Sequence, residues 1–274
     1  MGNSRTNSDL MFESYLRQRG ISFKYEPFGD ANKNPDYLVR ANGKKILFEV
    51  KEIEKLPFDI ASEGSLKTGK AFGLNPVVEY NLLRRRIDTA SKQLKPYTDQ
   101  VDYSIIILGK KDGFGIDIDA LFYAMFGDPY ISIPIDPSTG GGSMEKSTLE
   151  MKVTGSFRKN RPQTKMMYSL HNYVSAVGLI KSFSARSYYQ QKIIERYTKS
   201  KKYEAMTPEE GYHYLCEMTA KHENLVPGVY SDPSKVLYKL ELVTNPLGEK
   251  PLPEKLFYSK WDYIRVPKVI EQII

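Results

Sequence analysis

The chain has 274 residues, 41% of them hydrophobic and 27% charged, which is typical of a globular protein and not of a disordered or fibrous one. Its 40 Lys and Arg exceed its 33 Asp and Glu, so the formal net charge of +7 suggests a polyanionic partner, although many proteins with this charge have none. The longest apolar runs, such as Ser104–Leu108, are too short to cross a bilayer, so we expect no membrane contact. The single cysteine, Cys216, excludes an intramolecular disulfide and a thiolate metal cluster, and we expect an intracellular, cytoplasmic protein.

The first 110 residues predict a helix, three strands, a helix and a strand. Ser8-Asp9 is a plausible N-cap and Gly20 a plausible stop for the first helix. Asn42-Gly43 between two strand-like runs is a strong hairpin signal. The predicted elements are a helix over 10–19, strands over 21–26, 36–41 and 45–51, a helix over 76–97 and a strand over 103–108. Such an order predicts an α/β (α+β) fold with a mixed central sheet flanked by helices.

The rest of the chain is less regular. Residues 119–126 predict a helix, and the Pro-rich and Gly-rich segment 127–143 predicts a flexible connection. Strands over 173–183 and 236–243 and a helix over 187–202 are expected beyond it. We therefore predict a core over 1–126, a connection over 127–143, and a basic, Tyr-rich C-terminal region over 144–274 that grips nucleic acid and packs on the core.

The predicted hairpin brings three charged residues together. If Asn42-Gly43 is a two-residue turn, Asp36 lies directly opposite Glu49, about 4.5–5.5 Å away on the same face. Lys51, two positions further on, shares that face. Two opposed carboxylates repel each other unless a hard divalent cation lies between them. With a neighbouring lysine to orient water or stabilise charge on a phosphate, this set is typical of a hydrolytic phosphodiester site. The alternative is a solvated hairpin end in which Asp36 or Glu49 pairs with Lys51 or Lys45.

These residues also carry a resemblance to a known family. Pro35-Asp36 followed by Glu49-Val50-Lys51 resembles the PD-(D/E)xK motif of the restriction-endonuclease-like nuclease superfamily. The predicted order of elements over residues 8–110 is similar to the αβββαβ core of that superfamily, here with a C-terminal extension.

The resemblance implies a role for each motif residue. Asp36 and Glu49 would be metal ligands together with the Val50 carbonyl, and Lys51 would position the attacking water or steady the transition state. The ion would be Mg²⁺ or Mn²⁺, because all the donors are oxygens. Two flanking residues fit the same pattern, with ordinary roles as the alternatives. Glu13 would be an outer or second-metal ligand, or else a surface carboxylate. Gln93 would orient the site or touch the phosphate, or else be an ordinary polar helix residue.

Positive charge is concentrated in the second half. Residues 151–203 hold twelve Lys and Arg against one acid, a net +11, so the remaining residues sum to 7 − 11 = −4. Interleaved tyrosines suit a surface that grips a nucleic-acid backbone, although a solvated basic surface is the alternative. The predicted nucleic-acid-binding residues are Lys67, Lys70, Arg85, Lys92, Arg158, Lys159, Arg161 and Lys165.

Together these features predict a Mg²⁺-dependent DNA endonuclease, a metal-binding hydrolase of a restriction or phage-defence system. A catalytically silent nucleic-acid-binding subunit of a larger complex and a repair or junction-resolving nuclease are the alternatives. RNA as the substrate, and a homodimer or a partner protein in a defence complex, stay open.

Overall fold

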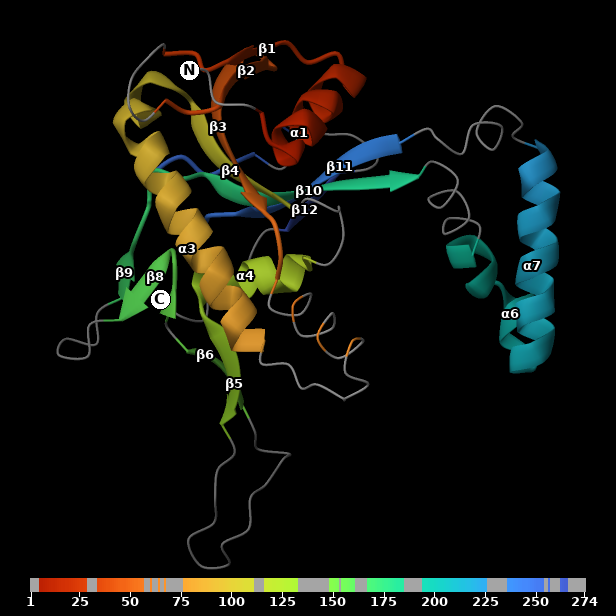
Figure 1. Cartoon of the computed structure of the whole chain (residues 1–274). Coiled ribbons are helices and arrows are strands. Elements are labelled where there is room, and N and C mark those ends of the chain that lie inside the picture. The colour runs from red at the N-terminus through yellow and green to blue at the C-terminus, as the bar shows by residue number, and fades with distance from the viewer. Residues whose placement is uncertain are drawn as a thin grey trace, which may run out of the picture. The chain divides into compact units, whose positions relative to one another are not determined.

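The computed structural model shows a mixed α/β fold with a seven-stranded sheet and helices on its faces (Figure 1). It describes residues 5–28, 34–56, 60, 64, 67, 76–110, 116–132, 148–152, 154–160, 167–184, 194–225, 236–253, 256 and 262–265. The chain forms two compact units, one of Met1–Lys181 with Lys239–Ile274 and one of Ser182–Tyr238. The predicted fold class, a mixed central sheet flanked by helices, is confirmed. Among the residues described, no helix is both long and apolar enough to span a membrane.

The predicted order of the first six elements is also found. The helices are α1 (Asn7–Gln18), α3 (Pro76–Leu94), α4 (Ile118–Phe126), α6 (Lys201–Glu204) and α7 (Pro208–Leu225), with a 3-10 helix η1 (Lys95–Gln100). The strands are β1 (Phe23–Tyr25), β2 (Tyr37–Ala41), β3 (Lys44–Ile53), β4 (Tyr103–Lys110), β5 (Asp128–Ser132), β6 (Thr148–Lys152), β7 (Thr154–Gly155), β8 (Arg158–Asn160), β9 (Met167–Ser169), β10 (Ala176–Ser184), β11 (Val236–Thr244) and β12 (Tyr263–Arg265).

Local chemistry explains where the first elements begin and turn. Helix α1 starts at a capping box in which Thr6 and Asp9 bond each other's backbone N–H, two residues before the N-cap predicted at Ser8-Asp9. Asn42 and Gly43 both have positive φ, 50° and 74°. A two-residue hairpin turn needs positive φ at both positions so that its twist matches the twist of the strands. The predicted turn is therefore confirmed.

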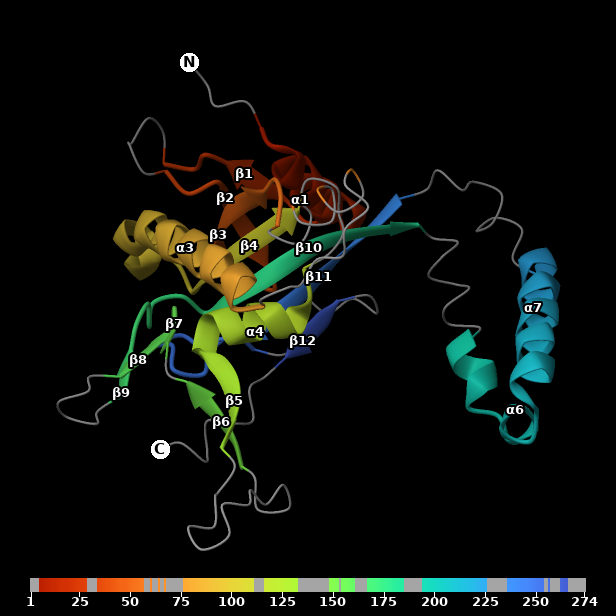
Figure 2. The ribbon, with the colours of Figure 1, turned by 60° about the horizontal axis from the view of Figure 1, so that its bottom comes forward.

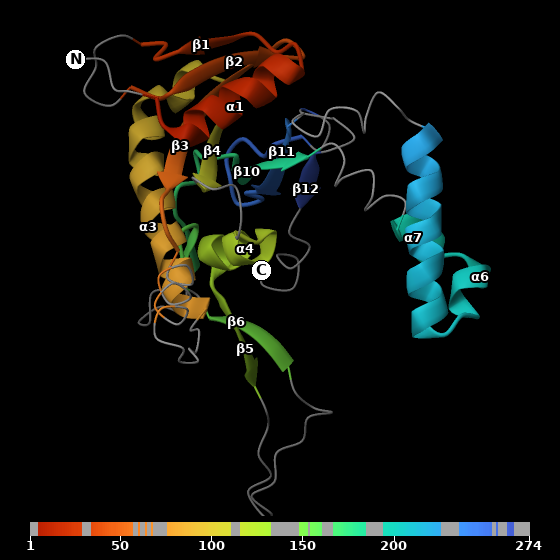
Figure 3. The same cartoon turned by 45° about the vertical axis from the view of Figure 1, so that its right-hand side comes forward.

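The sheet order is β1-β2-β3-β4-β10-β11-β12. Strands β1, β2 and β3 are antiparallel, whereas β4 runs parallel to both β3 and β10. Successive residues of β3 face opposite sides of the sheet. Phe48 packs on Phe12 of α1 with ring centroids 4.8 Å apart, and Leu47 is buried in a cluster with Leu83 and Ile87 of α3. Strands β3 and β4 thus lie between α1 and α3 (Figure 3).

Strands β10, β11 and β12 of the C-terminal part of the chain continue this sheet, whereas the second compact unit is formed by Ser182–Tyr238. The apolar residues Ala176–Ile180 of β10 pair with Ile105–Gly109 of β4, and β11 and β12 continue the same sheet. The two compact units therefore do not divide at residues 127–143, where the connection was predicted. Residues 128–132 of that segment form β5, which pairs with β6, and residues 133–143 lie outside the described part of the chain. The apolar residues of β10 pair with the buried strand β4, so β10 joins the sheet although a turn-rich sequence precedes it.

The helix predicted over 187–202 is found only in part. Residues 194–198 are helical, α6 begins after an N-cap at Ser200, and residues 185–193 lie outside the described part. The helix and the strand predicted over 119–126 and 236–243 are confirmed by α4 and β11.

A close approach between α1 and the sheet should make Gly109 intolerant of any side chain. A Cβ built there would lie 2.4 Å from Ser8 Oγ, 2.7 Å from Ser8 Cβ and 2.9 Å from Ile180 Cγ2. We expect Gly109→Ala to lower the free energy of unfolding by about 2–3 kcal/mol, as overpacked cores do. Chemical denaturation measures this. Gly64→Ala, whose Cβ meets nothing within 4 Å, should stay close to the wild type, and equal effects of the two changes would refute the argument.

Candidate active site

The site is built on the hairpin of β2 and β3, and its predicted register is confirmed. Tyr37 pairs with Phe48 and Ala41 with Lys44, so Asp36, directly before β2, falls opposite Glu49. Strand β2 starts only at Tyr37, whereas β3 stays paired with β4 as far as Ile53. Beyond Glu49, therefore, β3 has no β2 neighbour. Asp36 and Glu49 lie where the sheet opens.

Asp36 is held in place by the backbone of the facing strand. The Val50 N–H donates to Asp36 Oδ2 at 2.7 Å. The N–H and C=O of one strand residue point to the same side, so the Val50 carbonyl also faces the edge on which Asp36 lies. Burial raises the pKa of Asp36 to about 6, against the lowering effects of the Val50 hydrogen bond and Lys51.

Glu49 is a buried carboxylate with one counter-charge. Its side chain is 0% exposed and its Oε1 forms an ion pair with Lys51 Nζ. Burial and then the neighbouring charge of Asp36 raise the pKa of Glu49 to about 8, although Lys51 and a hydrogen bond from the Asp36 backbone lower it. The fold therefore holds a buried carboxylate whose charge its partners offset only in part.

Lys51 is less buried than its partner. Its side chain is 20% exposed, so the ammonium reaches towards solvent from the same side as Glu49. The sequence also allowed a solvated hairpin end in which Glu49 pairs with Lys51. The pairing is present, but Glu49 is buried and not solvated. A buried Glu49 needs another explanation.

A divalent cation would supply what Glu49 lacks. Among the described residues, no group of three or more His, Cys, Asp and Glu side chains is placed to hold a metal ion. The donors at the open end of the sheet are two carboxylates and one backbone carbonyl. That small, all-oxygen set fits Mg²⁺ or Mn²⁺, because Mg²⁺ keeps several of its waters and takes one or two carboxylates from the protein.

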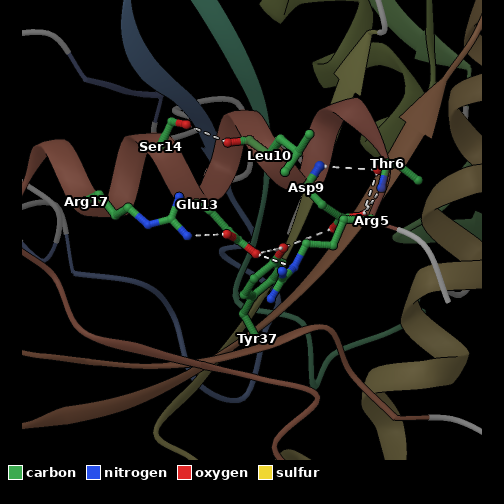
Figure 4. A network of polar contacts seen from close by, with 8 residues as sticks. All are labelled: Arg5, Thr6, Asp9, Leu10, Glu13, Ser14, Arg17 and Tyr37. Carbon is green, nitrogen blue, oxygen red and sulfur yellow. Dashed lines mark hydrogen bonds and ion pairs between the residues drawn. The ribbon is translucent and has the colours of Figure 1, made fainter. Parts of the chain in front are cut away.

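Glu13 takes part in a different network, which Figure 4 shows. Its buried carboxylate pairs with Arg5 at 2.6 Å and with Arg17, and lies 3.3 Å from the Tyr37 hydroxyl. Tyr37 points to the α1 side of the sheet, the side opposite to Glu49. Within the described part of the chain, no hydrogen bond or ion pair joins Glu13 to Asp36 or Glu49. The ligand role expected of Glu13 stays a prediction, and its alternative as a surface carboxylate is excluded because its side chain is 1% exposed.

The same network holds residues that the sequence did not single out. Asp9 Oδ1 lies 3.3 Å from the Tyr37 hydroxyl, and the charge of Asp9 is one of those that raise the pKa of Asp36. The Thr6-x-x-Asp9 spacing of a capping box was the available signal for Asp9. No local signal in the sequence pointed to Tyr37, whose hydroxyl lies between the two carboxylates.

Gln93 lies near the end of α3 and is half-buried. No described contact joins it to Asp36, Glu49 or Lys51. Four residues later, Tyr97 stacks on Phe28 with ring centroids 4.2 Å apart. Helix η1, which follows α3, thus contacts Phe28 ahead of Asp36, and the orienting role of Gln93 stays a prediction.

The predicted nucleic-acid-binding residues are placed in several parts of the chain. Arg85 and Lys92 are exposed on α3, and Lys67 is exposed as well. The residues Arg158 and Lys159 belong to β8. Lys70, Arg161 and Lys165 lie outside the described part.

The basic block of residues 151–203 is not one element. It is shared between the two compact units, which divide after Lys181. Lys181 itself pairs with Glu241, so its charge is already compensated within the protein.

The raised pKa of Glu49 should make the metal-free protein less stable at high pH. A carboxyl whose folded pKa is raised stabilises the fold below its ordinary pKa of 4.5, and that contribution is lost as the pH rises through about 8. Glu49→Gln stays neutral, so in EDTA its Tm should exceed that of the wild type by several °C at pH 9 and by little at pH 5. Glu54→Gln, at an exposed carboxylate beyond β3, is the control. Parallel Tm curves for the wild type and Glu49→Gln would refute this explanation.

Comparison with known proteins identified no relative of this chain. No family model, no curated protein and no solved structure matches the chain. The resemblance to PD-(D/E)xK nucleases therefore depends on the motif residues and the order of the elements, and what the chain does must follow from the geometry of the site.

Proposed function

We propose that this protein is a metal-dependent nuclease that hydrolyses phosphodiester bonds of DNA. The observation that carries the proposal is the buried Glu49 carboxylate opposite Asp36, whose charge Lys51 offsets only in part. A fold gains little stability from a buried carboxylate of this kind, so a function that uses the charge accounts for it better than packing does.

Each residue of the site has a distinct task in such a reaction. Asp36, Glu49 and the Val50 carbonyl would hold Mg²⁺ or Mn²⁺, which when bound acts as a Lewis acid and lowers the pKa of water. Lys51 is fixed by its ion pair with Glu49, and its ammonium can orient the attacking water or stabilise charge developing on the phosphate. The Val50 N–H keeps Asp36 facing the open end of the sheet.

The wider surface suits a nucleic acid. Arg85 and Lys92 are exposed on α3, the helix that covers the sheet face bearing Glu49. Cationic side chains in such a position attract phosphates without reading bases, because backbone contacts carry no sequence information. A DNA endonuclease of a restriction or phage-defence system is the specific form we propose. A nuclease for repair or junction resolution would use the same site.

Cleavage assays test this proposal directly. With Mg²⁺, the protein should cut plasmid, linear or single-stranded DNA, and Asp36→Ala, Glu49→Gln and Lys51→Ala should each lower the rate at least about 100-fold. Lys44→Ala should leave the rate within about twofold, because Lys44 lies at the hairpin turn and pairs with Asp102. Full activity in Asp36→Ala or Lys51→Ala would refute the assignment. Binding without cleavage of DNA or RNA would instead support a silent subunit, and preferential cleavage of RNA would change the substrate.

Metal binding has a readout that is independent of cleavage. Mg²⁺ at 100 times its Kd should stabilise the protein by about 2.7 kcal/mol, seen as a rise in Tm of a few °C. The rise should be larger at pH 8 than at pH 5, because the raised pKa values of Asp36 and Glu49 leave both carboxyls protonated at the lower pH. Asp36→Asn and Glu49→Gln should abolish it, whereas Glu54→Gln should retain it. An equal rise in all of these proteins would contradict a site at Asp36 and Glu49.

A further inference from the structure

Helix α3 carries three kinds of residue along its length. Its apolar side, with Leu83, Ile87, Ala90 and Leu94, is buried in the core. A second row, at intervals of four and seven residues, contacts the segment between residues 156 and 173. A third row is exposed to solvent and is basic. The second and third rows together suggest a function for this side of the molecule.

The second row is formed by Arg84 and Asp88 of α3 and continues to Lys95, the first residue of η1. The Arg84 carbonyl accepts a hydrogen bond from Ser156 Oγ at 3.3 Å. Asp88 Oδ1 lies 3.2 Å from His171 Nε2. Lys95 Nζ lies over the ring of Tyr173, 6.0 Å from its centroid. Positions four residues apart lie on one side of an α-helix, so this side of α3, with Lys95 directly after its end, holds the chain on either side of the β8–β9 hairpin.

His171 is the centre of this attachment. Its Nδ1 lies 3.0 Å from the Tyr173 hydroxyl. A carboxylate only accepts hydrogen bonds, so Nε2 carries the proton towards Asp88 and, in the neutral ring, Nδ1 accepts from Tyr173. The backbone of His171 has φ +54°, in the left-handed region that residues other than Gly seldom adopt. A strained residue with both ring nitrogens engaged fixes one arrangement of the turn that follows β9.

The hairpin itself is anchored on its other side by α4. The N–H groups of Ser156 and Phe157 donate to the carbonyls of Ala124 and Met125, at 2.9 and 2.8 Å. Phe157 is fully buried and its ring meets the edge of His171. Figure 2 shows β7, which leads into β8, beside α4. The ends of the hairpin are therefore held on two helices, and the hairpin is placed at a fixed distance from the exposed row of α3.

The exposed row is basic. Arg85 and Lys92 are exposed and lie seven positions apart, on one side of the helix. Arg86, the residue after Arg85, is exposed as well. Strand β8 begins with Arg158 and Lys159. Asp88, the acidic residue among them, is engaged by His171 and so is turned towards the hairpin.

We propose that the exposed row of α3 and the β8–β9 hairpin form one surface for the phosphate backbone of duplex DNA, and that the Asp88–His171–Tyr173 chain positions the hairpin on it. The occupant is a polyanion because the residues that α3 exposes there are Arg and Lys. The choice of DNA among polyanions rests on the proposed nuclease function. Asp88, His171 and Tyr173 are positioning residues in this arrangement and need not touch the DNA.

The charge of Asp88 lets one substitution distinguish a positioning role from a purely electrostatic effect. Asp88→Asn removes a negative charge from a basic surface, so electrostatics alone predicts tighter binding of DNA. If Asp88 positions the hairpin, the same change should weaken binding about threefold to tenfold and lower the salt slope of log K by about one, as the loss of one phosphate contact does. Asp99→Asn makes the same change of charge at an exposed site in η1 and should not weaken binding.

The measurement is fluorescence anisotropy with a labelled DNA duplex in EDTA over a range of salt concentrations. Arg85→Ala with Lys92→Ala should lower the salt slope by about two. His171→Asn, which tolerates the left-handed backbone, and Tyr173→Phe should repeat the effect of Asp88→Asn without any change in the charge of a carboxylate. Thermal unfolding identifies any variant that is not folded. If Asp88→Asn or His171→Asn does not fold, the binding of Tyr173→Phe, the mildest change, tests the inference.

Two results would overturn the inference: binding by Asp88→Asn and Tyr173→Phe as tight as that of the wild type, or an unchanged salt slope in Arg85→Ala with Lys92→Ala. Failure of the proposed function would look different. In that case the predicted pattern of binding would be present, but no metal ion would support cleavage of DNA. Since the binding assay holds no metal ion, the two proposals fail separately.

Discussion

The buried carboxylate of Glu49 is the constraint on which the rest of the site depends. Its position follows from the hairpin register, because Asn42-Gly43 sets Tyr37 opposite Phe48 and so Asp36 opposite Glu49. The burial follows from α3, which covers that face of the sheet. One lysine offsets part of the charge, and the raised pKa shows that the offset is incomplete. A cation bound beside Glu49 would therefore offset the rest of its charge.

The two faces of the hairpin explain how such a site is kept rigid. On the α1 side, the Tyr37 hydroxyl lies 3.3 Å from both Asp9 and Glu13, and its ring contacts Phe12, Phe23 and Tyr25. Burial and the two carboxylates raise the pKa of Tyr37, which keeps its hydroxyl protonated as a donor. Asp36 directly precedes this anchored residue. The α1 network thus holds the start of β2 in place, and the opposite face bears Glu49 and Lys51.

The sequence allowed the hairpin to be predicted in detail because every signal for it is local. A turn dipeptide and two alternating runs set the register of Asp36 and Glu49, and the order of the first six elements followed in the same way. The role of β10 and β11 could not be found in this way, since parallel pairing with β4 joins residues about seventy positions apart, such as Ile105 and Ala176. The contact of His171 with Asp88 spans 83 residues and left no trace in spacing or composition. Glu13 had the expected position on α1, but its partners Arg5 and Tyr37 depend on how α1 lies on the sheet.

Helix α3 joins the parts of the molecule that the proposals concern. Its apolar side buries the sheet face on which Glu49 lies, and its second row fixes the β8–β9 hairpin through Ser156 and His171. A helix packed against a sheet along its apolar side moves little, since shifting it would expose that side to water. Its exposed basic row therefore has a fixed relation to Asp36 and Glu49. If DNA lies along that row, the same helix that buries the carboxylates also determines which phosphate reaches them, and changes in its packing should affect where the strand is cut before they affect whether it is bound.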